Sequence, residues 1–410
     1  MTCRGPARAR RARELAELEV LPDVAVAVAE GRIADVGPWP TLRDRYRGAD
    51  VTEISGVLFP GFIDCHTHGV FGDLRLDDHQ RRALGESYQT IAASGGGILQ
   101  SVRDVRARDA GDLEALARAR LLTLRAHGST TIEVKSGYGL ELETELKQLR
   151  VVRRLAETER LRLVPTFLGA HEVPPEFRSR RAEYVRLVIE EMLPAVAQEK
   201  LARCCDVFCE PGVFTVPEAR AVLTAARRHG LALKLHADEL EGSGGAELAV
   251  ELGALSADHL AGISDAGIHA LAASDTVAVL LPATMSFLGK LRQAPARRLL
   301  EAGAAIALAT DFNPGSSPTI GLPLVMSLAV SQLGLRHAEA LLAVTVNAAV
   351  AELSEESVAV HVTVVSPIGN VSVWFGPGVT GAPVLSSTQL KVGNPSVPKK
   401  ASTASAAVTL

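Results

Sequence analysis

The sequence has little of the features that mark several specialised classes of protein. Only five of its 410 residues are cysteine, 4% are aromatic, and no apolar run approaches the roughly 18 residues of a membrane-spanning helix. The cysteines show no regular spacing, which argues against a disulfide framework and favours a reducing compartment, most simply the cytosol. The net charge of −4, with no clustered basic excess, argues against binding to nucleic acid or to a membrane surface.

The chain begins with "MTCRGPARARRAR", which contains five arginines and no acidic residue before Glu14. Such a start is typical of either a transit peptide or a disordered terminus. The scarcity of serine and the acidic stretch that follows at once favour the second interpretation, in which about the first 20 residues are disordered.

Between residue 56 and about residue 311, eight short β-prone apolar runs alternate with longer amphipathic segments. The runs are "VLFPGFIDCHTH", "TTIEVKSG", "LVPTFLGAH", "CCDVFCEPG", "LALKLHADE", "GALSADHL", "VAVLLPAT" and "AAIALATDFNPG". Two of the intervening segments, 112–128 and 216–230, read as helices that close on glycine. Eight strands joined by helical connections predict an α/β fold, a closed (β/α)₈ TIM-type barrel over residues 56–353. An open doubly wound sheet is the alternative, but no G-x-G-x-x-G opens any of these helices.

The segments on either side of the predicted barrel are also β-prone. Residues 1–55 contain "VAVAVAEGRIADVG", in which alternating valines and a Glu-Gly turn predict a hairpin. A hairpin is too small to fold alone, so we expect partner strands from the far end of the chain and a small β domain built from both segments. Residues 354–410 offer "SVAVHVTVVSPIGNVSVWFGPGV", whereas "NPSVPKKASTASAAVTL" at the very end is predicted to be disordered.

Five of the eleven histidines fall where the predicted strands end, and an aspartate ends the eighth run. These residues are His66, His68, His171, His236, His259 and Asp311. All strand C-termini of such a barrel open on one face, where active sites lie, so we expect these side chains to converge. His66 and His68 are two residues apart on a strand and therefore point the same way. Together with His236 and Asp311 they predict a site for one Zn²⁺ or Fe²⁺ ion, which would activate water to hydrolyse a polarised carbonyl or amidine.

Several stretches resemble the amidohydrolase superfamily and, within it, the imidazolonepropionase family. They include "PGFIDCHTH", "EVKSGYGLELETELKQLRV", "TFLGAHEVPPEF", "HADEL" and "ALATDFNPGSSPT", and the resemblance runs from about residue 56 to residue 350. It implies a metal-dependent hydrolase in a (β/α)₈ barrel, with one zinc or iron ion per chain and dimerisation. The implied reaction opens the ring of 4-imidazolone-5-propanoate, a small molecule of histidine degradation, to give N-formimino-L-glutamate.

The resemblance also implies roles for individual residues. The metal ligands would be His66, His68, His236 and Asp311. Glu239 occupies the position of the proton shuttle, and His259 that of a group that either supports the metal ligands or polarises the carbonyl. The spacing leaves open whether Glu239 or Asp311 is the general base. The substrate would contact Arg75, Tyr138, His171, Asn313, Gly315 and Ser316, with Arg75 as the partner of the propionate.

Two other kinds of function remain open. One is a different cyclic-amide hydrolase or a deaminase of the same superfamily; the other is a non-catalytic scaffold that keeps the barrel. The intact ligand set argues against the scaffold, since a scaffold has no need of four converging ligands plus Glu239. The sequence departs from the family pattern around "HGVFGDLRLDDHQ" and after "TVNAAVAELS", so the substrate-carboxylate loop and the C-terminal strands have less support than the metal site.

Overall fold

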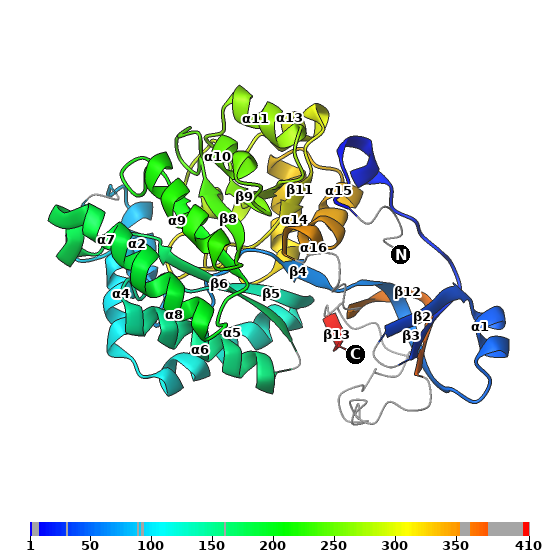
Figure 1. Ribbon diagram of the computed structural model, residues 1–410. Helices are drawn as coiled ribbons and strands as arrows, with labels where there is room; N and C mark the ends of the chain where they lie inside the picture. The colour runs from blue at the N-terminus through cyan, green and yellow to red at the C-terminus, as the bar shows by residue number, and fades with distance from the viewer. Residues whose placement is uncertain are drawn as a thin grey trace. The chain divides into compact units, whose positions relative to one another are not determined.

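A computed structural model describes residues 1, 8–29, 32–87, 90–91, 94–159, 161–352, 361–375 and 405–409. The chain divides into two compact units (Figure 1). One unit comprises residues 1–4, 19–61 and 359–410, and the other comprises residues 5–18 and 62–358. The second unit contains every residue for which a catalytic, substrate-binding or metal-binding role is expected.

The larger unit is built on eight parallel strands, in which each strand is hydrogen-bonded to the next along the chain. They are β4 (Phe62–Asp64), β5 (Ser129–Lys135), β6 (Arg162–Ala170), β7 (Cys204–Cys209), β8 (Ala232–Ala237), β9 (Ser256–His259), β10 (Val277–Leu280) and β11 (Ile306–Leu308). A parallel bridge between Thr67 and Phe312 joins the segments that follow the first and last strands, and the His68 N–H donates to the Phe312 carbonyl oxygen at 2.8 Å. This closure confirms the predicted barrel and excludes the open sheet.

Helices follow the strands and surround them (Figure 1). In chain order they are η1 (Ala12–Ala16), α2 (Leu76–Ala83), α4 (Ile98–Ala107), α5 (Ala110–Ala126), α6 (Leu142–Thr158), η2 (Pro175–Arg180), α7 (Arg181–Leu187), η3 (Val188–Met192), α8 (Leu193–Gln198), α9 (Val216–Arg228), α10 (Gly245–Glu251), α11 (Asp265–Ala272), α12 (Pro282–Phe287), α13 (Ala296–Ala302), α14 (Leu322–Gln332), α15 (His337–Ala343) and α16 (Val346–Glu352). No helix in the described part of the chain combines the length and the apolar character needed to cross a bilayer.

The two helices predicted from leucine and alanine spacing, α5 and α9, begin and end for identifiable reasons. The Asp109 side chain accepts the Asp112 N–H at the start of α5, and Thr215 and Glu218 form a capping box at the start of α9. Gly128 and Gly230, just beyond the two C-termini, have φ angles of 98° and 79°, a conformation that favours glycine. Local sequence signals therefore define where these two helices begin and end, and hence where the neighbouring strands can begin.

The smaller unit is a sheet in which β12 (His361–Phe375) lies between β1 (Val24–Ala29) and β3 (Asp50–Pro60). β1 and β2 (Arg32–Pro38) form the predicted antiparallel hairpin, and α1 (Trp39–Arg45) follows it. β12 thus supplies the partner strand that the hairpin needed, which confirms a small β domain built from both ends of the chain. β13 (Ser405–Thr409) pairs with β12, so the disorder expected for the final stretch does not extend to these residues; residues 376–404 lie outside the described part.

Residues 8–18 belong to the larger unit and are ordered as η1 and its flanks. The Arg10 backbone N–H donates to Asn347 Oδ1 at 2.8 Å, and the Asn347 amide donates back to the Arg10 carbonyl oxygen at 2.9 Å. Arg11 forms an antiparallel bridge with Ala305. Disorder in about the first 20 residues, expected from arginine-rich composition, therefore does not apply to this stretch; residues 2–7 lie outside the described part.

Candidate metal centre

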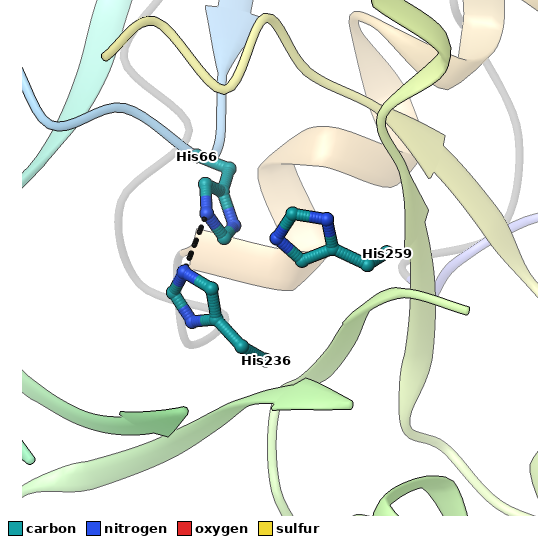
Figure 2. Close-up of side chains that lie close together, drawn as sticks. All are labelled: His66, His236 and His259. Carbon is teal, nitrogen blue, oxygen red and sulfur yellow. Dashed lines mark hydrogen bonds between the residues drawn. The ribbon is translucent and has the colours of Figure 1, made fainter. Parts of the chain in front are cut away.

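Four of the predicted ligands meet at the C-terminal ends of the strands. His66 and His68 follow β4, His236 lies in β8, and Asp311 follows β11. The Nε2 atoms of His66 and His236 are 3.1 Å apart, as the dashed line in Figure 2 indicates. Asp311 Oδ1 lies 3.5 Å from His66 Nε2 and 3.4 Å from His68 Nε2. The structure therefore brings together the four residues that the sequence singled out.

The separations between these atoms suit a metal ion. Ligands bound at about 2.1 Å in a tetrahedral arrangement lie about 3.4 Å from one another, as calculated from typical zinc–nitrogen bond lengths. The measured separations of 3.1, 3.4 and 3.5 Å agree with that value. Among the described residues, the groups spaced closely enough to share an ion are His66–His236–His259, His68–His171–His236 and His66–His68–Asp311, all buried. His171 and His259 therefore border the same site.

Buried carboxylates hold the far sides of two ligand rings. Asp258 Oδ2 lies 2.6 Å from His66 Nδ1, and Asp206 Oδ2 lies 2.9 Å from His236 Nδ1. A proton on each Nδ1, facing its carboxylate, leaves a lone pair on each Nε2. Two lone pairs facing each other at 3.1 Å repel unless a cation lies between them. The donor set thus fits a divalent metal ion.

Burial favours the neutral form of four imidazoles, the form in which histidine binds a metal. Burial, reinforced by neighbouring positive charge, lowers the pKa of His66 and of His68 well below the ordinary value. Burial likewise lowers the pKa of His171 well below its usual range and the pKa of His259 to about 3. Four imidazoles that burial favours in the neutral form thus lie in one site.

Backbone strain marks the rim of the same site. Asp311, His259, Leu260 and Asp238 have φ angles of 51°, 79°, 65° and 51°, a region that residues other than glycine rarely adopt. Each such residue costs on the order of 1–3 kcal/mol, and residues of this kind cluster at functional sites. All four follow or end strands β8, β9 and β11. Of these, Asp311 and His259 border the predicted ligands, whereas the Asp238 carboxylate accepts the backbone N–H groups of residues 243–246.

Glu239 lies in the segment after β8 and is held by Glu210, which was not predicted from the sequence. The Glu210 carboxylate, just beyond β7, accepts the backbone N–H groups of Glu239, Leu240 and Glu241 at 3.0, 3.2 and 2.8 Å. Burial, together with the charges of Asp311 and Glu210, raises the pKa of Glu239 well above its ordinary value. Burial therefore favours the protonated form of Glu239.

His259 faces Glu239 across the site. Its Nε2 lies 3.6 Å from Glu239 Oε2, is buried, and has no hydrogen-bond partner among the described residues. Its ring centroid lies 5.3 Å from that of His66 and 5.1 Å from that of His236 (Figure 2). A buried nitrogen without a partner is available to a bound molecule.

Tyr138 and His171 form one wall beside His68. The rings of His68 and His171 are stacked with centroids 5.1 Å apart, and Tyr138 lies 5.9 Å from His68 and 5.3 Å from His171. His171 Nδ1 lies 3.0 Å from the Gly137 carbonyl oxygen, which fixes the orientation of the ring. Burial raises the pKa of Tyr138 above its ordinary value, although the nearby charge of Arg75 opposes this shift.

Arg75 lies against the loop that follows Asp311. Its Nη1 donates to Ser101 Oγ at 2.7 Å, its Nε lies 3.3 Å from Asp78 Oδ2, and its backbone N–H donates to the Pro314 carbonyl oxygen at 2.7 Å. A methyl group at Gly315 would collide with the Arg75 guanidinium, so glycine is needed for this approach. Arg75 is therefore packed against this loop and is not an exposed surface charge.

Asn313 and Ser316 shape that loop from within. Asn313 Oδ1 accepts the N–H groups of Gly315 and Ser316 at 2.9 and 2.7 Å, and its Nδ2 donates to the Asp311 carbonyl oxygen at 2.7 Å and to Ser316 Oγ at 2.9 Å. The Asn313 amide is thus used to fold the loop. Asp311 Oδ2 accepts a hydrogen bond of 2.6 Å from Thr284 Oγ1. Thr284 was not predicted from the sequence to belong to the site.

The chain is similar in sequence to known families and proteins. The pattern of the amidohydrolase family matches residues 57–351, and that of the imidazolonepropionase-like composite domain of bacteria matches residues 25–49. The imidazolonepropionase of Rubrobacter xylanophilus is 52% identical over 343 residues, which cover 83% of this chain and 82% of the relative. That of Solibacter usitatus is 49% identical over 354 residues, 85% of this chain and 84% of the relative.

Solved structures share the fold at much lower identity. The guanine deaminase of C. acetobutylicum with bound guanine superposes with a TM-score of 0.60 at 13% identity, covering 84% of this chain and 90% of the other. An adenosine deaminase from Xanthomonas campestris with bound zinc gives a TM-score of 0.58 at 17% identity, covering 84% and 85%. The family pattern matches most of the barrel, and the relatives named above are about half identical to this chain. The chain therefore belongs to the amidohydrolase family and, within it, to the imidazolonepropionases.

Proposed function

We propose that the protein hydrolyses 4-imidazolone-5-propanoate to N-formimino-L-glutamate. The observation that carries this proposal is the convergence of His66, His68, His236 and Asp311 in a chain about half identical to imidazolonepropionases. The reaction adds water across a ring C–N bond: the carbonyl carbon becomes a carboxylate and the ring nitrogen gains a proton. The site must therefore supply a nucleophilic oxygen, a proton for the nitrogen and a partner for the propionate.

His66, His68, His236 and Asp311 would hold one zinc or iron ion per chain. When bound, such an ion supplies Lewis acidity and lowers the pKa of water toward neutrality. The hydrogen bond from Thr284 Oγ1 orients the Asp311 carboxylate. Both zinc and iron accept imidazole and carboxylate ligands, so the donor set is compatible with either.

Proton transfer is assigned to Glu239 and Asp311. Asp311 Oδ1, between the Nε2 atoms of His66 and His68, accepts the proton of the attacking water. Glu239 holds a proton because its pKa is raised chiefly by burial, and it delivers that proton to the departing ring nitrogen. His259, with an unpartnered nitrogen facing Glu239, donates to the developing oxyanion.

The remaining residues would bind the substrate. Arg75 pairs with the propionate, and the wall formed by Tyr138 and His171 contacts the ring. Gly315 leaves room for the Arg75 guanidinium, while Asn313 and Ser316 fix the loop and present its backbone.

Replacing Arg75 with methionine should raise KM about 10- to 100-fold, because a charge-assisted contact with the propionate, worth about 1.5–3 kcal/mol, is lost. Gly315→Ala should shift KM in the same direction, since its methyl group would displace the guanidinium. Steady-state kinetics measure both variants. Arg81→Met, which removes a surface ion pair with Glu86 on α2, is the control and should leave KM unchanged. An unchanged KM for Arg75→Met would remove Arg75 from the substrate site.

The proposed activity is tested by the loss of imidazolonepropanoate absorbance on adding the purified protein, with hydantoin and guanine assayed in parallel. Rapid loss with imidazolonepropanoate alone is the expected result. Activity on guanine and none on imidazolonepropanoate would favour a deaminase instead. Absence of both activities in a protein that also retains no metal would favour a scaffold.

Two further properties are proposed on general grounds. A reducing compartment, the cytoplasm, follows from the burial of Cys65, Cys204, Cys205 and Cys209 as small packing residues. A homodimer is proposed from the resemblance to the family, and a sedimentation experiment measures it.

A further inference from the structure

Beneath the predicted ligands lies a cluster of charged side chains that the proposed reaction does not use. It consists of Glu133, Lys135, Asp206, Lys234 and Asp258, and each of them is 0% exposed. They come from four different strands, β5, β7, β8 and β9. We call this set the buried charge cluster. Three carboxyl groups and two ammonium groups at such depth are costly to desolvate, and a buried ion pair is seldom a net source of stability.

Lys135 is the hub of this cluster. Its Nζ donates to Glu133 Oε1 at 2.6 Å and to Asp206 Oδ2 at 2.8 Å, and lies 4.0 Å from Asp258 Oδ2. Although burial alone would discharge it, the charges of Asp206 and Glu133 raise the pKa of Lys135 above its ordinary value. Lys135 therefore carries a positive charge with its contacts directed at carboxylates inside the barrel.

Two of these carboxylates are the groups behind the ligand rings. Asp206 Oδ2 lies 2.9 Å from His236 Nδ1, and Asp206 Oδ1 accepts the His236 backbone N–H at 3.1 Å. Asp258 Oδ2 lies 2.6 Å from His66 Nδ1. The oxygen of Asp206 that faces the His236 ring is the same oxygen that accepts from Lys135. The Lys135 ammonium group thus holds the Asp206 carboxylate, which in turn holds the His236 ring.

We propose that Lys135 is a positioning residue for the metal centre: by holding Asp206 in place, it aims the Nε2 atom of His236 toward that of His66 before the ion arrives. This inference rests on the proposed metal site. A positioning role explains why the buried charge cluster lies under the predicted ligands, although apolar residues would fill the same volume with a smaller desolvation free energy. Residues behind metal ligands commonly affect affinity by about 10- to 100-fold.

The test is the metal affinity of metal-free protein, measured by competition with a chromogenic zinc chelator. Lys135→Met should weaken zinc binding about 10- to 100-fold. Asp206→Asn should weaken it by a comparable factor. Because Lys135 acts through Asp206, the double variant should bind zinc about as weakly as Asp206→Asn alone, so the two effects are not additive.

Lys147→Met is the matched control. Lys147 is a partly buried lysine on α6 that donates to the carbonyl oxygens of Val105 and Arg108 at 2.9 and 2.8 Å. Its replacement should change stability but not zinc affinity. Urea unfolding and circular dichroism of each metal-free variant establish that it is folded, and Lys135→Gln replaces Lys135→Met if the latter is not.

The outcomes separate this inference from the proposed function. If the wild-type protein binds no zinc or iron, the metal site itself fails. If the wild type binds zinc and Lys135→Met binds it within twofold of the wild type, or if the effects of Lys135→Met and Asp206→Asn multiply, the positioning role is overturned while the proposed function stands.

Discussion

Replacing His66 with alanine should abolish turnover and strip the protein of its metal. His66 is a predicted ligand whose Nε2 lies 3.1 Å from His236 Nε2 and 3.5 Å from Asp311 Oδ1, and whose Nδ1 lies 2.6 Å from Asp258 Oδ2. Loss of metal-ion stabilisation worth several kcal/mol corresponds to a decrease in kcat/KM of about 1,000-fold or more. Metal content by mass spectrometry and steady-state kinetics measure the two effects.

His229→Ala is the matched control for this experiment. His229 is exposed at the C-terminal end of α9, where its backbone N–H contacts carbonyl oxygens of that helix. Its loss should leave both metal content and rate unchanged. Treating the wild-type protein with a chelator should reproduce the inactivity of His66→Ala, and added zinc or iron should restore the activity of the wild type alone. Full activity in the His66 variant would contradict the assignment of the metal centre.

Replacing Glu239 with glutamine should lower kcat about 100- to 10,000-fold, the usual contribution of a positioned acid or base. Glutamine keeps the size of the side chain but has no acidic proton to give to the ring nitrogen. Because Glu239 is not among the predicted ligands, the metal content should stay at the level of the wild type. The decrease should appear in kcat more than in KM, since the carboxyl group acts on the leaving nitrogen and not on the propionate.

The control for this change lies two residues away in the same segment. Glu241 is exposed, and only its backbone N–H contacts Glu210, so Glu241→Gln should retain the rate of the wild type. A Glu239→Gln variant with undiminished kcat would transfer both proton steps to Asp311. That outcome would change the mechanism without affecting the metal site.

The histidines at the strand ends show how much of the site can be predicted from local sequence patterns. The sequence predicts that His66 and His68 point the same way because side chains two apart on a strand share a face. In the structure β4 ends at Asp64 and both histidines follow it, yet both lie beside Asp311. His236 and His259 were predicted to join them because parallel strands in a barrel end on one face. These predictions needed only the order of the eight β-prone runs along the chain and the rule that eight such strands close into a barrel.

Other residues of the site were missed, although a signal for them exists in the sequence. Glu133 and Lys135 in "IEVKS", and Lys234 in "LKLHA", alternate with apolar residues inside runs that are otherwise typical of buried strands. A charged residue at every second position of a buried strand indicates an interior lined by charges. Glu210 offers no comparable signal, because its role depends on the backbone of residues 239–241, which are about 30 positions further along the chain.

The sequence by itself determined the barrel, its eight strands and the residues that end them, because hydrophobic period, helix caps and glycine stops act over a few residues. Only the tertiary structure decided how side chains from different strands meet: Lys135 with Asp206, Asp258 with His66, and Arg75 with Gly315. The physical reason is that these contacts depend on the register and closure of the whole barrel, which bring together atoms separated by as many as 240 residues. The ligands could be read from the chain, whereas the charges that orient them could be identified only in the folded protein.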